Sequence, residues 1–275
     1  MSAIRAIHSE EQLASQLSAL GVEGGAVVMV HASLRRVGAV EGGPRTVIRA
    51  LRHVLGPDGT LVVPAFTSEN SDTSTSFLER VRGLSDEARA AVLADMPAFD
   101  RAATPALSMG SLAETLRLTP GALRSDHPQT SFAALGPHAE KVVAGHRPDC
   151  HLGEGSPLAH LYGVRAQVLL LGVGFERCSA FHLAEYRVPR PPRRHYRCVV
   201  SCHDERRWWQ YEDVDLDDSD FAALGADFEH SDETGAVRAG PVGSAHCRLV
   251  RFRDAVDFAQ RWIPSHRGTA ADRDG

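Results

Sequence analysis

Three short, almost uninterrupted apolar runs mark the chain: Ala26–His31 (AVVMVH), Thr60–Phe66 (TLVVPAF) and Val168–Gly174 (VLLLGVG). Runs of this length without polar alternation are typical of strands that are buried on both faces of a sheet. The segment between the first two, Pro44–Leu55, has helical spacing, begins with proline and is followed by glycine. Proline suits a first helical turn and glycine the residue after a last one, so the pattern predicts a βαβ unit with parallel strands.

Weaker signals fill in the rest of the fold. Ser9 followed by Gln12 forms a capping box, and leucines at helical spacing then predict a helix that ends before Gly21. Residues 195–204 and 206–215 alternate in polarity around charged turn residues, which predicts an antiparallel hairpin.

The polar stretch 68–105, with a helix expected over 85–94, is long enough to be a lid or binding loop. A final helix is expected over 253–263. The sequence therefore predicts one α/β domain, residues 1–265, with a central mostly parallel or mixed sheet, flanking helices and an antiparallel C-terminal hairpin. Residues 266–275 are expected to form a disordered tail.

Composition narrows the class of protein. The chain has 275 residues, 43% of them hydrophobic, and its charged N-terminus and lack of a long apolar run predict neither secretion nor a membrane span. Five cysteines without a Cys-x-x-Cys pair fit a reduced, cytoplasmic chain. A net charge of −5 disfavours nucleic acid as the main partner and leaves room for a cationic substrate. Fourteen histidines invite a zinc site, but they are scattered, so no metal site is predicted.

Three stretches could carry chemistry. In the first, residues 28–44, His31 and Ser33 follow a buried strand, where ligand crevices of open α/β sheets lie. His31 could equally be a hydrogen-bonded strand-end residue, and the glycines do not have the spacing of a phosphate loop. In the second, residues 124–137, polar side chains around His127-Pro128 suit phosphate or amide recognition, or a plain loop corner.

The third stretch, Ser179–Tyr186 (SAFHLAEY), sets His182 three residues before Glu185. A histidine suits a general base near neutral pH, and a carboxylate commonly orients such a base. Glu185 or the acidic run Glu212–Asp220 (EDVDLDDSD) could supply that carboxylate. A satisfied core histidine remains the alternative.

Taken in order, these segments resemble the aminoglycoside 3-N-acetyltransferases, within the broader antibiotic N-acetyltransferase family. The resemblance covers about residues 21–250 and rests on VMVHASLRRVG, GGPRTVIRAL, GPDGTLVVPAF, MPAFDRAATP, RSDHPQTSFAALGPHA, GEGSPLAHLYGVRAQVLLLGVGF, FHLAEYR and GPVGSAHCRL. It implies a single α/β domain and acetyl transfer from acetyl-CoA to the 3-amino group of a 2-deoxystreptamine ring.

The resemblance also implies site residues. His182 corresponds to the essential base and His31 to a second histidine that the site needs. Coenzyme contacts are implied at Ser33, Leu34, Arg35, Val37, Gly38, Ser108, Met109, Ser125 and His127. Asp217 is expected behind His182, with Asp215 and Asp218 as rivals, and Ser179 as a hydroxyl donor to the oxyanion. The cationic substrate is expected to contact Glu185, with Asp215 and Asp218 as further acidic candidates and Asp72 and Glu69 as weaker ones.

One departure from the family stands just before the motif. Family members often carry Asn-Thr where this chain has Cys178-Ser179. Ser179 keeps a hydroxyl, whereas Cys178 lacks the amide. Direct transfer in a ternary complex needs no cysteine nucleophile, so none is assigned.

Three other functions stay open from the sequence. The chain could acetylate another amine, such as a biosynthetic intermediate, act as a metal-dependent hydrolase through its histidines, or bind coenzyme without turnover. A monomer or a homodimer is expected.

Overall fold

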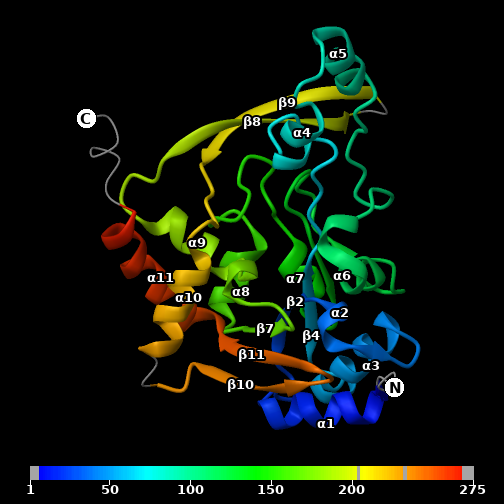
Figure 1. Ribbon diagram of the computed structural model, residues 1–275, viewed down its shortest axis with the longest axis vertical. Helices are drawn as coiled ribbons and strands as arrows, with labels where there is room; N and C mark the ends of the chain where they lie inside the picture. Colours follow the sequence, from blue (N-terminus) through cyan, green and yellow to red (C-terminus); the bar gives the residue numbers. More distant parts are fainter. Residues whose placement is uncertain (1–5, 203–204, 232–233, 268–275) are drawn as a thin grey trace, which may run out of the picture.

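The computed structural model describes residues 6–202, 205–231 and 234–267. Within these ranges the core is a seven-stranded mixed sheet with the strand order β10, β11, β7, β2, β4, β6, β5 (Figure 1). The strands are, in that order, Val237–Val242, Ala245–Arg251, Gln167–Leu171, Val27–Ala32, Thr60–Pro64, Phe132–Leu135 and Leu123–Arg124. The expected α/β fold with a mixed central sheet is thereby confirmed.

The three apolar runs are the central strands. β2 pairs parallel with β4 on one side and with β7 on the other, so that Met29 lies opposite both Val62 and Val168. Between β2 and β4 the chain forms α3, Pro44–Leu55, which gives the expected βαβ unit. The remaining sheet pairings are antiparallel, and they place the outer strands around this parallel centre.

Alternate residues of each central strand enter two separate cores. Val28 and Val30 pack on one face of the sheet, whereas Val27 and Met29 pack on the other. The first face is covered by α1 (Glu10–Leu20), α3 and α6 (Gly110–Arg117). The second is covered by α7 (Ala139–Val143), α8 (Pro157–Gly163), α9 (Ala180–Arg187), α10 (Phe221–His230) and α11 (Phe252–His266). Because both faces are covered, the strands need no polar alternation.

Local signals explain where the first helices begin and end. The Ser9 side chain accepts from the Gln12 N–H and the Gln12 side chain accepts from the Ser9 N–H, which is the expected capping box of α1. Gly21 ends that helix at φ 107°, a left-handed conformation that glycine adopts without strain. The helix predicted over 85–94 is α5, Asp86–Ala94, capped by Ser85.

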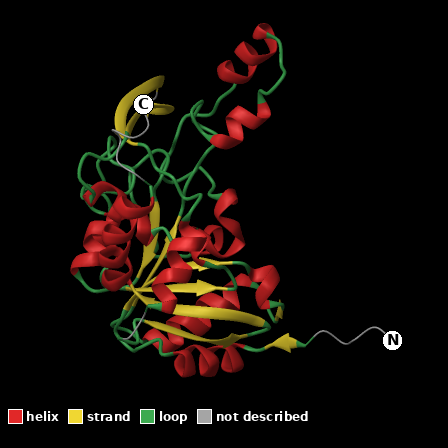
Figure 2. Cartoon of the chain, turned by 60° about the vertical axis from the view of Figure 1, so that its left-hand side comes forward, coloured by secondary structure: helices red, strands yellow, loops and turns green. Residues whose placement is uncertain are grey.

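The polar stretch 68–105 folds against the hairpin instead of forming an open loop. It contains α4, Thr75–Arg80, besides α5, and the hairpin consists of β8, Arg193–Cys202, and β9, Glu205–Val214. Both project from the same end of the sheet (Figure 2). Phe77, Val81, Met96 and Val199 form a small apolar core between them. The sequence missed this packing because Val199 comes from a segment of the chain that is distant from the other three residues.

Short elements complete the chain. β1 (Ile7–His8) pairs with β3 (Ala39–Val40), and α2 (Leu34–Val37) follows β2 directly. Two 3-10 turns, η1 (Leu107–Met109) and η2 (Phe175–Arg177), precede α6 and α9. No helix among the described residues is both long and apolar enough to cross a membrane.

The C-terminal helix continues further than expected. α11 runs through Pro264 to His266, and the Arg267 N–H donates to the Ile263 carbonyl at 3.0 Å. His266, which the sequence placed in the tail, therefore belongs to α11, and the Arg267 backbone is hydrogen-bonded to that helix. The rest of the expected tail, 268–275, lies outside the described residues.

Two leucines, Leu116 in α6 and Leu118 just after it, test which side chains stabilise the packing of α6 on the sheet. Leu116 is fully buried, whereas Leu118, two residues on, is 63% exposed. Leu116→Ala is expected to lower the free energy of unfolding by about 2–5 kcal/mol, because it removes buried methyl groups and leaves a cavity. Leu118→Ala should change it by less than about 0.5 kcal/mol. Urea unfolding of both variants measures the difference, and equal effects would contradict this packing.

Candidate active site

The candidate site lies where two parallel strands end side by side. β2 leads into Ser33 and α2, while β7 leads into η2 and α9. The Ser33 N–H donates to the Leu171 carbonyl at 2.9 Å, which joins the two strand ends. From β2 the chain crosses to β4 on one side of the sheet, and β7 lies next to β2 on the other side. The end of β2 is therefore a switch point, the place where crevices form in α/β sheets.

His31 occupies the end of β2 as a neutral imidazole. It is 7% exposed, and its Nε2 accepts the Ser179 N–H at 3.4 Å, so the ring proton lies on Nδ1. Burial is the main cause that lowers the pKa of His31 to about 3, and repulsion from the nearby Arg177, and from His182 when that ring is protonated, contributes. His31 therefore stays uncharged at neutral pH and offers a hydrogen bond without a charge.

His182 lies on α9 and is paired with a carboxylate on the same helix. Its Nδ1 lies 2.6 Å from Glu185 Oε2, one helical turn away. The ring also packs on Phe221, with the ring centres 4.7 Å apart. A neutral ring that donates from Nδ1 has its lone pair on Nε2, as a general base requires.

The structure differs from the expected carboxylate behind His182. Glu185, not Asp217, is hydrogen-bonded to the ring, because the i, i+3 spacing of α9 brings the two side chains together. Asp217 instead donates its backbone N–H to Glu185 Oε1 at 3.0 Å, and its own carboxylate accepts the Ser219 N–H. Glu185 is only 3% exposed and its carboxylate has internal partners, so its expected contact with the substrate stays a prediction.

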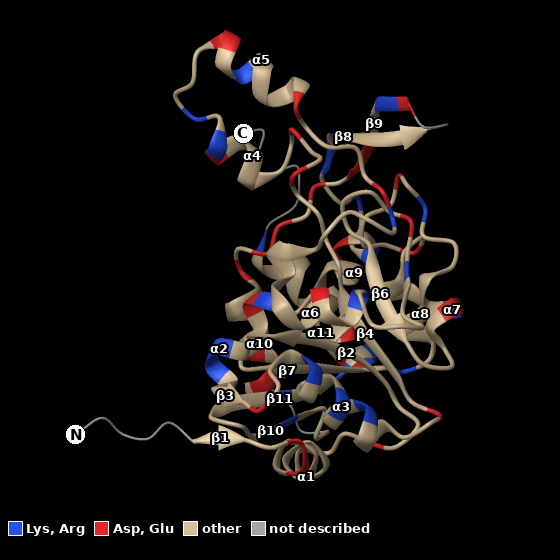
Figure 3. Ribbon diagram, turned by 90° about the vertical axis from the view of Figure 1, so that its right-hand side faces the viewer, with Lys and Arg blue, Asp and Glu red and all other residues tan. Residues whose placement is uncertain are grey.

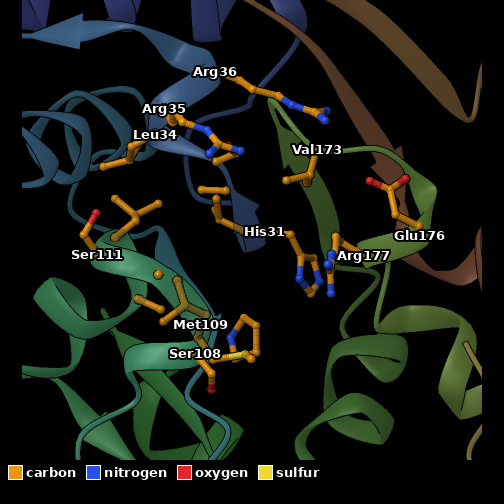
Figure 4. Close-up of a pocket in the computed structure, with 18 residues that line it drawn as sticks. His31, Leu34, Arg35, Arg36, Ser108, Met109, Ser111, Val173, Glu176 and Arg177 are labelled. Atoms are coloured by element: carbon orange, nitrogen blue, oxygen red, sulfur yellow. The ribbon is translucent and has the colours of Figure 1, made fainter. Parts of the chain in front are cut away.

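A pocket opens beside His31 between α2, η1, α6 and η2 (Figure 4). Of the expected coenzyme contacts, Ser33, Leu34, Arg35, Ser108 and Met109 lie on its wall. Arg36, Ser111, Glu176 and Arg177 also line it, although the sequence did not single them out. Figure 4 shows Arg177 beside the His31 ring. In the sequence, the adjacent residues Arg35 and Arg36 are a signal that could have indicated an anionic ligand. Both arginines lie on α2, and Figure 3 shows this helix as basic.

Other expected coenzyme contacts lie away from this pocket. Val37 is fully buried in the core under α2. Gly38 has φ 96°, and a side chain there would meet Ser244. Ser125 and His127 are 1% and 0% exposed and are held by internal hydrogen bonds, so the loop-corner interpretation of this stretch describes it better.

His127 belongs to a buried histidine cluster, which we define as His127, His146 and His151. The ring centre of His127 lies 4.8 Å from each of the others. His151 Nδ1 lies 2.9 Å from Asp213 Oδ2, and the Tyr186 hydroxyl donates to the same oxygen at 2.6 Å. Because Tyr186 is on α9 and Asp213 on β9, the cluster fixes the hairpin to the helix that carries His182.

The other expected acidic contacts are spread out. Asp72 forms an ion pair with Arg197 on the hairpin, and Asp215 lies 3.5 Å from Arg194. Asp217 and Asp218 are exposed in the loop between β9 and α10. Asp72 is therefore engaged with the hairpin, and the roles of Asp217 and Asp218 in substrate binding stay predictions.

Residues Cys178 and Ser179 lead into α9. Cys178 is fully buried, and burial raises the pKa of its thiol to about 12, so it holds its proton at neutral pH. Ser179 is the N-cap residue of α9 and gives its backbone N–H to His31. Among the described residues, no three His, Cys, Asp or Glu side chains form a group that could hold a metal ion.

Known proteins are similar to this chain in sequence and in fold. The family model described as aminoglycoside 3-N-acetyltransferase matches residues 29–264. The chain is 36% identical over 256 residues to the SPbeta prophage-derived aminoglycoside N(3')-acetyltransferase-like protein YokD of Bacillus subtilis (strain 168), with 93% of this chain and 92% of that protein covered. It is 37% identical over 270 residues to aminoglycoside N(3)-acetyltransferase VII of Streptomyces paromomycinus, with 94% and 92% covered.

Solved structures agree. AAC-IIIb in a binary complex with CoASH matches with a TM-score of 0.82 at 32% identity, over 96% of this chain and 99% of that one. AAC-VIa bound to sisomicin matches with a TM-score of 0.81 at 30% identity, over 96% and 100%. The chain belongs to the aminoglycoside 3-N-acetyltransferase family. The expected enzyme class, an N-acetyltransferase, is confirmed.

The buried histidines predict an acid-sensitive fold. Burial lowers the pKa of His146 to about 4, and it also lowers the pKa values of His31, His127 and His151. The unfolded chain takes up these protons below about pH 6.5 and the folded chain does not, so stability is present above that pH and is lost as the pH falls. For His146 alone the loss between pH 7 and pH 5 is about 2 kcal/mol.

Urea unfolding at pH 7 and pH 5 measures this loss. His146→Asn should reduce the pH-dependent part, whereas His53→Asn, at an exposed position on α3, should leave it unchanged. A free energy of unfolding that stays constant between the two pH values would contradict the buried neutral state.

Proposed function

We propose that the enzyme transfers the acetyl group of acetyl-CoA to the 3-amino group of 2-deoxystreptamine aminoglycosides. The transfer is direct, within a ternary complex, and His182 is the general base. The observation that carries this proposal is the 2.6 Å hydrogen bond from His182 to the buried Glu185 at the switch point of the sheet. Family membership and the AAC-IIIb complex with CoASH support the co-substrate.

The chemistry follows from the state of the two histidines. An aminoglycoside amine is mostly protonated at neutral pH, and it must first release one proton to solvent because only the free amine can attack a thioester carbonyl. His182 Nε2 takes a proton from the attacking nitrogen while Glu185 stabilises the imidazolium that forms. The nitrogen–carbon bond forms, the carbon–sulfur bond of the tetrahedral intermediate breaks, and the proton passes to the departing thiolate of CoA.

The oxyanion and the substrate charges need their own groups. The Ser179 hydroxyl and the N–H edge of neutral His31 are the donors we assign to the developing oxyanion. Asp217 and Asp218, exposed near α9, attract a polycationic ring system. AAC-VIa, a relative, has been solved with the aminoglycoside sisomicin bound.

A second substrate class has one observation in its favour. Asp72 and Asp215 are already paired with arginines, which leaves fewer acidic groups for a molecule with many ammonium groups. An amine with a smaller positive charge, such as a biosynthetic intermediate, therefore remains the alternative.

Replacement of the base tests the mechanism. His182→Gln is expected to lower kcat by about a hundred- to ten-thousand-fold, because an amide side chain cannot take the proton that the histidine ring accepts. Release of free CoA with a panel of aminoglycosides is the assay, and NMR of the product identifies the acetylated nitrogen. The control His53→Gln, at an exposed position on α3, should retain full activity.

Two results would count against the proposal. If the wild-type enzyme releases no CoA with any 2-deoxystreptamine compound but does so with another amine, the alternative substrate class is correct. If His182→Gln keeps its turnover, His182 is not the base.

The basic wall of the pocket predicts the coenzyme's phosphate contacts. Arg35 is exposed on α2 and lines the pocket, so we expect its guanidinium to bind an anionic phosphate. Arg35→Gln should raise the KM for acetyl-CoA by about 5- to 30-fold with little change in kcat. Steady-state kinetics measure this, and Arg52→Gln, exposed on α3, is the control of equal charge. Equal KM values in the two variants would place the phosphates elsewhere.

A further inference from the structure

Arg267, immediately after α11, reaches back to the carboxylate behind His182. Its side chain is 13% exposed. One terminal nitrogen, Nη1, donates to Glu185 Oε1, and the other, Nη2, donates to the Asp217 carbonyl at 2.7 Å. Nε donates to Asp220 Oδ2 at 2.7 Å. The guanidinium thus joins the last helix to α9 and to the start of α10 (Figure 1).

The two oxygens of Glu185 have separate partners. Oε2 faces His182, whereas Oε1 receives Arg267 and the Asp217 N–H. This division fixes the rotation of the carboxylate, so that Oε2 stays directed at the imidazole. Phe221 packs against both partners of Glu185, with its ring centre 4.7 Å from the His182 ring and 5.8 Å from Arg267 Cζ.

Charge balance gives Arg267 a second effect. A carboxylate as buried as Glu185 requires a compensating positive charge. If His182 were the only group able to supply this positive charge, its pairing with Glu185 would favour the protonated ring. A protonated ring cannot accept a further proton. Arg267 supplies the charge permanently, since its guanidinium does not lose its proton under ordinary conditions.

We infer that Arg267 is a positioning residue that orients Glu185 and balances its charge, so that His182 rests neutral and ready to accept a proton. This inference deepens the proposed function and rests on His182 being the base. It assigns a role in the reaction to a residue at the far C-terminal end of the fold, which makes no contact with the reacting atoms itself.

The other titratable and charged groups around His182 define the background for this effect. They come from β2, η2, α9, the loop before α8 and the loop before α10, and comprise His31, Arg177, Glu185, His151, Asp217 and Asp220. His31 is held neutral by burial, and Asp220 shares Arg267 with Glu185. Loss of Arg267 therefore leaves excess negative charge beside the imidazole.

The main experiment compares Arg267→Gln with Arg267→Lys and with Arg261→Gln, an exposed arginine on the same helix. In Arg267→Gln we expect kcat to fall by about 10- to 100-fold at pH 7, with the KM values for both substrates within about threefold. The acid limb of the pH–rate profile should move upward by roughly half a pH unit or more, because the remaining negative charge stabilises the imidazolium. The loss should therefore shrink at alkaline pH.

Two further variants separate positioning from simple attachment of the helix. Arg267→Lys keeps the charge and should restore part of the activity and most of the pH profile. Asp220→Asn removes the other ion pair of Arg267, and it should lower thermal stability without moving the acid limb upward. In an enzyme that already carries Glu185→Gln, adding Arg267→Gln should lower kcat by less than a further factor of about three, because the two residues act through one hydrogen bond.

A readout independent of turnover distinguishes this inference from the proposed function. Histidine NMR should show the titration midpoint of His182 at a higher pH in Arg267→Gln than in the wild-type enzyme. If that midpoint moves while the wild type acetylates no aminoglycoside, Arg267 has the inferred role and the proposed substrate is wrong. An unchanged midpoint together with an unchanged pH–rate profile, in a folded Arg267→Gln or Arg267→Lys enzyme, overturns the inference.

Discussion

The site depends on one constraint: the carboxylate of Glu185 is buried and must be fully hydrogen-bonded. A buried carboxylate without partners costs several kcal/mol, roughly, so its neighbours are part of the same structural unit. His182 on α9, the Asp217 N–H before α10 and Arg267 after α11 meet at its two oxygens. The packing of α9, α10 and α11 on one face of the sheet therefore determines the surroundings of the His182 ring.

The parallel centre of the sheet determines where this unit lies. Because β2 and β7 run side by side and end together, His31 and the start of α9 face each other across the switch point. The pocket that contains His31 opens beside the same strand ends. The hydrogen bond from Tyr186 to Asp213 attaches α9, the helix that carries His182, to the hairpin.

Histidine serves several different purposes in this chain. His182 is partly accessible and paired with a carboxylate, whereas the buried histidine cluster and His31 are held neutral by burial. Neutral imidazoles can both donate and accept, which lets them connect loops whose backbone groups would otherwise be unsatisfied inside the protein. Four of the fourteen histidines, His31 and the buried histidine cluster, are thus buried and take part in internal hydrogen bonding.

The sequence by itself determined the elements whose signals are local. Apolar runs gave the central strands, Pro44 and Ser9 marked helix starts, and the i, i+3 spacing of His182 and Glu185 required no knowledge of the fold. Tertiary structure decided everything that joins distant segments: Val37 and His127 turn inward, the stretch 68–105 packs on the hairpin, and Arg267 reaches Glu185. Burial and charge pairing depend on which segments meet in space, and local periodicity carries no information about partners 82 residues apart.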